Sequence, residues 1–250
     1  MKKTTKKITI MAVSALMLTV SIVTVSCAGF LDELKKELPM DLSIGQEKGL
    51  NERTIIDGLK EALSVSTENA VKTTSKTNGY FKNPEIKIPI PPKIEKVGET
   101  LRKAGFNKQV DEFILSMNRA AEKAAPKAAS IFVDAIKRMS FDDARGILDG
   151  GDTAATEYFQ RKSSVKIADE FRPVITEAMD SVGATKNFKK IMDIYKKIPF
   201  TESKSIDLDE YVTELATNGL FLMLGNEEKK IRKDPAARVT ELLKKVFGGK

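Results

Sequence analysis

The chain of 250 residues contains no histidine, no tryptophan and a single cysteine, Cys27. Without histidine it cannot form a Ser-His-Asp triad, a Cys-His pair or a histidine metal site. One cysteine excludes a disulfide within the chain. No glycine motif of the GxxxxGKS/T or GxGxxG type is present to bind a nucleotide phosphate. The sequence therefore indicates no catalytic residue, no metal ligand and no nucleotide cofactor.

Positive charge is concentrated at the N-terminus. Lys2, Lys3, Lys6 and Lys7 account for four of the seven net positive charges, so residues 27–250 carry a formal charge of +3. The remaining basic residues are interleaved with acids, a pattern typical of solvated helix surfaces. Because a nucleic-acid binder needs a concentrated basic face, the sequence predicts no nucleic-acid partner.

The first 27 residues resemble the signal of a bacterial lipoprotein. The four lysines precede an apolar run from Ile8 to Val25, and the small residue Ser26 stands before Cys27. In such signals the cysteine is lipidated and becomes the new N-terminus. The resemblance implies a signal peptide over residues 1–26, a covalent lipid on Cys27 as membrane anchor, and a tether over residues 27–50. Several acyl chains give a stable anchor.

Two other interpretations of this segment remain open. Cleavage after Ala28 would discard the cysteine and release a soluble protein, whereas an uncleaved apolar run would sit at the lower length limit for a membrane span. If Cys27 is lipidated, the alanine after it, in place of aspartate, resembles outer-membrane sorting signals. The expected location is then the outer membrane facing the periplasm, in a host with two membranes.

Residues 51–250 are predicted to form one all-α domain, because apolar residues recur at helical spacing and alternating strand patterns are nearly absent. Asn51, Asn107, Ser140, Asp152 and Asp207 are the expected N-caps. Pro126 should kink or restart its helix, and Pro173 should kink the helix around 164–182. Helices are expected at 51–79, 94–104, 107–136, 140–148, 152–159, 164–182, 186–198, from 207 onward, and after Asp234-Pro235.

Two segments have unusual patterns. Residues 219–224 are apolar on every side, so this part of the C-terminal half should be buried in the middle of the domain. Residues 80–92 combine four prolines with alternating Ile86, Ile88 and Ile90, which predicts an extended path. That path is either a partner-docking segment or a connector with buried isoleucines, and the second is the commoner use.

Three polar groups are candidate sites. Asn118, Arg119 and Glu122 can share one side of a helix, as a polar pocket for an anionic ligand or as an ion pair between helices. Glu228 and Arg232 have the spacing of a helical ion pair, with Glu227 and Arg238 nearby.

The third group is acidic and comprises Asp142, Asp143, Asp149, Asp152 and Glu157. An oxygen-rich loop can hold Ca²⁺, but the spacing does not match an EF-hand, and helix capping explains the same residues. The sequence therefore predicts no metal site there. Paired carboxylates also serve glycoside hydrolysis, although sugar sites usually add aromatic platforms and this chain has four tyrosines and no tryptophan.

Several short blocks, in order, resemble a family of exported bacterial proteins known only as a domain of unknown function, DUF4197. The blocks are 118–122, 143–148, 154–159, 220–221, 227–232 and 235–238. The resemblance covers roughly residues 55–247. It implies a helical domain in the cell envelope, and it implies no activity, cofactor or catalytic residue.

The sequence as a whole favours a lipid-anchored envelope protein with a binding or structural role. Its expected partner is a small apolar ligand in the helical core or another envelope protein. The alternative is a hydrolase that uses Asp143, Asp152 or Glu228 on an envelope substrate. An internal cavity would favour the ligand, and a filled core would favour protein docking.

Overall fold

The computed structural model describes residues 52–181, 184–196 and 206–238, together with 241 and 244. Within these ranges it contains helices and no strand, which confirms the all-α single domain. The signal peptide, Cys27, the tether and the Asn51 cap lie outside the described residues. The helices are α2 (Glu52–Ser75), α3 (Glu95–Lys103), α4 (Asn107–Ala124), α5 (Ala128–Lys137), α6 (Phe141–Asp149), α7 (Ala154–Ser181), α8 (Ala184–Lys196) and α9 (Leu208–Lys233).

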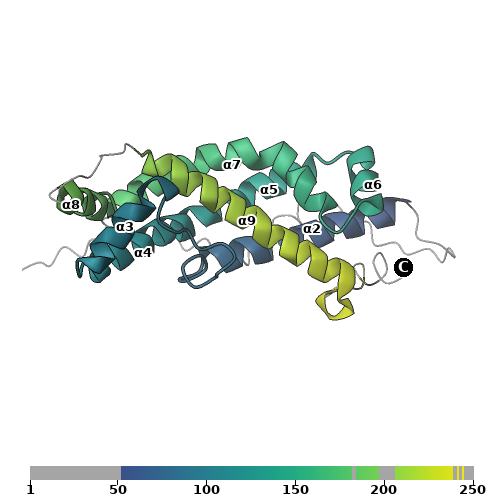
Figure 1. Cartoon of the computed structure of the whole chain (residues 1–250). Helices are drawn as coiled ribbons and strands as arrows, with labels where there is room; N and C mark the ends of the chain where they lie inside the picture. Colours follow the sequence, from purple (N-terminus) through teal and green to yellow (C-terminus); the bar gives the residue numbers. More distant parts are fainter. Residues whose placement is uncertain (1–51, 182–183, 197–205, 239–240, 242–243, 245–250) are drawn as a thin grey trace, which may run out of the picture.

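The helices form an elongated bundle (Figure 1). The long helices α2, α4, α7 and α9 pack against one another along its length, and α9 crosses the bundle diagonally. Of the short helices, α3 and α8 lie at one end and α6 at the other, beside the start of α2, whereas α5 lies along the middle (Figure 1). Among the described helices, none is long and apolar enough to cross a membrane.

Local sequence signals set several helix boundaries. The Ser140 hydroxyl accepts a hydrogen bond from the Asp143 amide, and the Asp143 carboxylate accepts one from the Ser140 amide, so α6 begins with a capping box. The hydrogen bonds from Ser140 lower the pKa of Asp143. The Asp207 carboxylate caps α9 through the Glu210 amide. Each of these starts was predicted from sequence.

The ends of α3, α4 and α9 also follow the sequence. Gly105 has φ +88°, and the bonds from Gly105 N to Arg102 O and from Phe106 N to Leu101 O close α3 with a Schellman motif. Pro126 has no backbone N–H and interrupts the helical hydrogen bonds. Helix α4 therefore ends at Ala124, and one 3₁₀ turn leads into α5. The Asp234 carboxylate accepts from Ala236 N at a 3₁₀ turn, Pro235–Ala237. The expected inward residues of the last helix, 239 to 247, lie outside the described residues.

Some predicted boundaries are wrong. Helix α2 ends at Ser75 and not at Asn78-Gly79, and Asn107 is the first residue of α4, preceded by Phe106, without a side-chain cap. The two helices expected at 152–159 and 164–182 are one, because α7 continues through residues 160–163, and it also continues through Pro173. The fully buried Phe171 and Ile175 flank this proline, and their burial offsets the roughly 3 kcal/mol that an interior proline costs.

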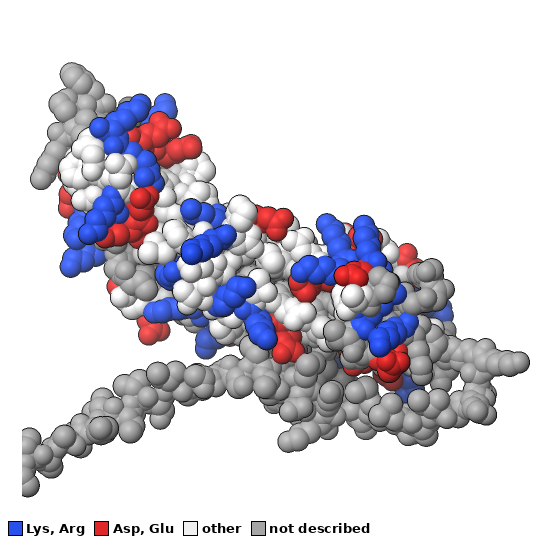
Figure 2. All heavy atoms as spheres, turned by 90° about the horizontal axis from the view of Figure 1, so that it is seen from below, with Lys and Arg blue, Asp and Glu red and all other residues white. Residues whose placement is uncertain are grey.

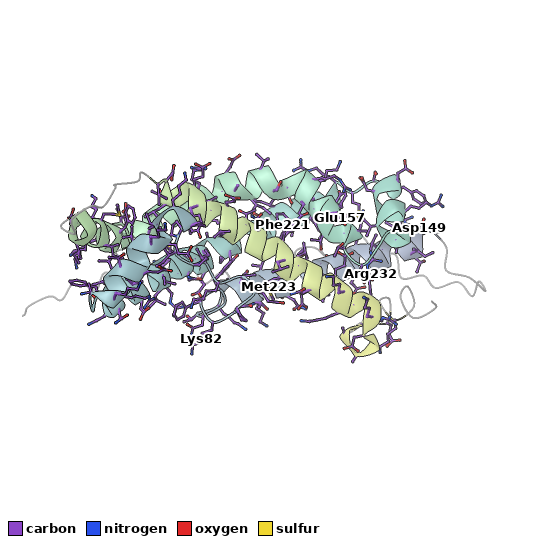
Figure 3. All side chains as sticks on the ribbon, in the orientation of Figure 1. Lys82, Asp149, Glu157, Phe221, Met223 and Arg232 are labelled. Atoms are coloured by element: carbon purple, nitrogen blue, oxygen red, sulfur yellow. The ribbon has the colours of Figure 1, made fainter. Side chains whose placement is uncertain are left out.

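Helix α9 contributes to the core along most of its length, and the prediction for its centre is correct except at one residue. Leu220, Phe221 and Leu224 are buried, whereas Leu222 is 45% exposed on the outer face. The Phe221 ring packs edge-on against the Phe132 ring, with 6.0 Å between the ring centres. Phe221 therefore points toward α5 and α7, and Met223 points to the other side of the helix (Figure 3).

The segment between α2 and the 3₁₀ turn at Pro92 lies against α4 and α9. Ile86 and Ile88 are buried and Ile90 is half-buried, whereas the prolines and lysines between them face solvent, apart from the buried Pro91. An added Cβ on Gly219 would lie 2.8 Å from Tyr80 and 3.1 Å from Ile86, so the segment approaches the α9 backbone closely. The interpretation of residues 80–92 as a connector with buried isoleucines is confirmed. The expected extended path is wrong for its first half, because hydrogen-bonded turns occupy residues 80–86.

Candidate functional site

The first polar group forms a cluster on α4, the Glu122 cluster: Glu122, Arg119, Asn118 and Asn78. One carboxylate oxygen of Glu122 accepts from the backbone amides of Tyr80 and Phe81, both at 3.2 Å, and the other accepts from Arg119. Arg119 also donates to the side chain of Asn78, 2.8 Å away. Glu122 is only 4% exposed, so its charge is neutralised within the protein.

Asn118 holds the next part of the same segment. Its amide oxygen accepts from Ile88 N at 2.9 Å, and its amide nitrogen donates to Ile88 O at 2.8 Å. It therefore pairs with one residue as a neighbouring strand would, and satisfies backbone groups that would otherwise be buried unpaired. The amide nitrogen donates in addition to Ile114 O within α4.

Tyr80 links the segment between α2 and α3 to α9. Its hydroxyl donates to Ala216 O at 2.6 Å, and its side chain is fully buried. Burial, and then the Glu122 charge, raise the pKa of Tyr80. The Glu122 cluster thus acts as a fastening of residues 78–88 between α4 and α9, which is the ion-pair interpretation and not a pocket open to a ligand.

The second polar group, the Glu228 cluster, comprises Glu228, Arg232 and the backbone groups they bind. The Glu228 carboxylate accepts from Ala155 N and Thr156 N, both at 2.9 Å, and from the Thr156 hydroxyl. These are amides of the first turn of α7, which have no partner within their own helix. A side chain of α9 therefore caps α7, and its negative charge lies at the positive end of the α7 dipole.

Arg232 completes the cluster from the other side. Its guanidinium bonds to Glu228 at 2.9 Å and donates to Ile147 O, in the last turn of α6. A cation thus lies at the negative end of one helix and an anion at the positive end of the next. Arg238 donates to Ile231 O and Arg232 O and so closes the end of α9. Figure 3 shows Arg232 on α9 beneath the turn between α6 and α7.

The acidic residues around this turn do not assemble into a site. Asp149 and Glu157 are exposed, and Glu157 accepts from Thr153. Asp152 forms an ion pair with Lys233 and does not cap α7 as predicted, and the bond from Lys233 lowers its pKa. Among the described residues, no three Asp, Glu or Cys side chains gather as metal ligands would.

The three carboxylates of the hydrolase alternative have separate structural partners. Asp143 belongs to the capping box of α6, Asp152 to the pair with Lys233, and Glu228 to the start of α7. A small pocket between α2 and α9 borders Glu228 and Arg232 and has room for about one water molecule. It is too small for an apolar ligand.

Sequence reasoning found the charged members of both clusters and missed their partners. Tyr80, Thr156 and Ile147 contribute mostly backbone groups, and a backbone amide has no signal in a sequence. The only local hint was the Asn78-Gly79 pair, and Asn78 indeed has φ +69°. Glu228 and Thr156 are 72 residues apart, so their contact follows from helix packing alone.

The blocks behind the family resemblance coincide with these two clusters. Residues 118–122 form the first, and parts of blocks 143–148, 154–159, 227–232 and 235–238 meet at the second. No curated protein and no solved structure matches the chain. The family model described as a protein of unknown function, DUF4197, matches residues 49–248. The chain therefore belongs to the DUF4197 family.

Proposed function

We propose that this protein is a lipid-anchored protein of the cell envelope with a binding or structural role. The observation that carries the proposal is Cys27, placed directly after a basic and then apolar N-terminal segment. The proposed location is the outer membrane facing the periplasm, if the host has two membranes. The membrane is reached through acyl chains on Cys27, and no other cofactor is proposed.

The use of the buried charges supports a non-catalytic role. Glu122 and Glu228 are each hydrogen-bonded to two backbone amides and one arginine, which leaves neither carboxylate free for proton transfer. A general acid or base needs an accessible position beside its substrate. No observation favours the carboxylate hydrolase, so we place it second.

A protein partner is favoured over a small apolar ligand. The pocket beside Glu228 holds no more than about one water molecule, whereas ligand sites for drug-sized molecules are several hundred Å³. The large side chains between the helices are fully buried, among them Phe113, Phe132 and Phe171. The proposed role is therefore to present a rigid helical surface at the membrane to another envelope protein.

The test of the anchor is the intact mass of the mature protein from the native host. The expected species begins at Cys27 and carries acyl chains, and the Cys27→Ser variant lacks them and accumulates uncleaved. A mature chain that begins at Gly29 would mean an ordinary secreted protein. A wild-type chain that still begins at Met1 would mean an uncleaved membrane anchor.

The test of the binding role uses the mature protein extracted from the envelope with detergent. Native mass spectrometry measures its mass together with any bound molecule, and cross-linking in the envelope then identifies a protein partner. The expected result is a protein mass without added small molecule and a defined cross-linked partner. Excess mass that is lost on denaturation would instead establish a bound ligand and overturn the docking role.

A further inference from the structure

One stretch of the domain has a strongly uneven charge. Residues 71–94 contain five lysines and one acid, Glu85, whereas elsewhere basic and acidic residues nearly balance. All five lysines are exposed, and four of them follow one another along the end of α2 and the connector: Lys72, Lys76, Lys82 and Lys87. We name these four the basic strip. The even interleaving that the sequence suggested for the whole domain does not hold here.

The geometry brings the lysines of the connector together. The Lys87 ammonium lies 4.7 Å from the centre of the Phe81 ring, next to Lys82 in the chain. Lys72 lies in the last turn of α2, and Lys76 directly follows the end of that helix. Lys82 projects from the lower edge of the molecule (Figure 3), and Figure 2 shows blue side chains across the middle of that lower face.

The strip differs from the other basic surfaces in its few acidic neighbours: the Glu68 carboxylate acts electrostatically on Lys72, one turn away in α2. Lys108, Lys166, Lys230 and Lys233 form ion pairs with neighbouring carboxylates. In the described part of the chain, no ion pair joins a lysine of the strip to an acid. Glu85, the acid within the stretch, is hydrogen-bonded by Asn226 of α9. The positive charge of the strip is therefore available to an external anion.

The backbone under the connector half of the strip is held in place. The Glu122 carboxylate binds the amides of Tyr80 and Phe81, and Asn118 binds both backbone groups of Ile88. Lys82 directly follows Phe81 and Lys87 directly precedes Ile88, so each lysine is next to a residue whose backbone is hydrogen-bonded. Their backbone positions are thus ordered before any binding event, which lowers the entropy cost of binding.

We propose that the basic strip binds the surface of an anionic lipid bilayer. This inference rests on the proposed function, because a lipid on Cys27 keeps the domain beside a membrane. Residues 27–51 can span at most about 85 Å when fully extended, so every face of the domain can reach that bilayer. Lipid phosphates are then the most concentrated anions available, and each lysine near them strengthens binding about fivefold.

The experiment uses the mature acylated protein, reconstituted in vesicles of phosphatidylcholine alone or mixed with phosphatidylglycerol. A membrane-impermeant amine reagent labels the lysines, and mass spectrometry measures each position. On the anionic vesicles, labelling of Lys82 and Lys87 is expected to fall severalfold and to recover at high salt. Labelling of Lys162 and Lys166 on α7 is expected to stay unchanged.

Matched variants test the charge directly. Lys82→Gln with Lys87→Gln should abolish the salt-sensitive protection of Lys76, since the loss of two lysines weakens binding to the anionic surface roughly twentyfold. The double variant Lys162→Gln with Lys166→Gln removes the same charge from α7 and should have no such effect. Equal labelling of the strip on neutral and anionic vesicles would overturn the proposal. Protection by a soluble polyanion but not by anionic vesicles would overturn it too.

The failure of the anchor is a separate result. A protein without acyl chains does not float with neutral vesicles, and the strip is then tested by adding that protein to anionic vesicles from solution. Salt-sensitive flotation with the anionic vesicles would support lipid binding by the basic strip, even though the lipid anchor on Cys27 is absent. Flotation with neutral vesicles together with unprotected strip lysines would support the anchor and overturn the strip.

Discussion

The Glu122 and Glu228 clusters contain the same kinds of chemical group but have different structural roles. Each has a buried glutamate, an arginine on the same helix and two backbone amides from a distant segment. In the Glu122 cluster the amides belong to a connector, and in the Glu228 cluster they belong to the first turn of α7. The first therefore fastens an irregular segment, and the second joins the ends of three helices.

The two clusters also differ in solvent access. The Arg119 side chain is 27% exposed, whereas that of Arg232 is 13% exposed and also binds the end of α6. A mostly buried arginine that loses its carboxylate is costly, because its charge is then left uncompensated away from bulk solvent. The comparison teaches that the same ion pair matters more where helices meet than where a connector is attached.

The largest expected effect is that of Glu228→Gln. It removes the anion at the start of α7 and leaves Arg232 without its counter-charge. We expect the free energy of unfolding to fall by about 3 kcal/mol, the lower end for breaking a buried pair. Urea denaturation of the purified protein measures it.

The control for Glu228→Gln is Glu214→Gln, which makes the same change at an exposed position of α9. That variant should stay within about 0.5 kcal/mol of the wild type. If the two variants lose equal stability, the Glu228 cluster does not join the helices as described.

An intermediate effect is expected for Glu122→Gln. Arg119 is partly exposed and can be solvated, so the loss should be about 1.5 kcal/mol, typical of a charged hydrogen bond. The change should be local, because the connector is the element released. Amide hydrogen exchange should speed up at Tyr80, Phe81 and Ile88 and stay unchanged at Ala155 and Thr156. Faster amide exchange at Ala155 and Thr156 instead would mean that the two clusters are not independent.

The smallest effects come from two glycines of α9, one beside each cluster. A Cβ on Gly219 would meet Tyr80 at 2.8 Å, whereas on Gly225 its nearest contact would be Thr156 at 3.6 Å. Gly219→Ala should lose about 1 kcal/mol through overpacking, after the helix propensity of alanine is included. Gly225→Ala should gain up to about 1 kcal/mol.

Thermal unfolding of the two alanine variants side by side measures this difference, since both make the same change in one helix. Stabilisation by Gly219→Ala would show that the connector does not press against α9 there. The connector would then be held by its hydrogen bonds alone.

Much of the fold could be predicted because its signals are local. The capping box at Ser140, the Asp207 cap and the stop at Gly105 each depend on residues within one turn. Predictions failed where distant contacts overrode local preference. The two helices expected at 152–159 and 164–182 form one continuous α7, and Asp152 pairs with Lys233 of α9 instead of capping α7.

For the candidate site, the sequence identified Asn118, Arg119, Glu122, Glu228, Arg232 and Arg238 but not what they bind. The charged pairs Arg119–Glu122 and Glu228–Arg232 are three and four residues apart, so helical spacing alone groups them. The distant backbone groups that Asn118, Glu122, Glu228 and Arg232 bind are 30 to 85 residues away. No pattern in the sequence marks a backbone amide as one that needs a carboxylate.

The sequence by itself determined the helical class, most helix ends, the lack of histidine chemistry and the basis for expecting a lipid on Cys27. These follow from residue types and short-range spacing, which act within a few residues. Only the tertiary structure decided that the buried charges join helices and fasten the connector. It also left the lysines of the basic strip with few acidic neighbours in the described part of the chain. Burial and long-range hydrogen bonding depend on which segments meet, and that is settled only when the helices pack.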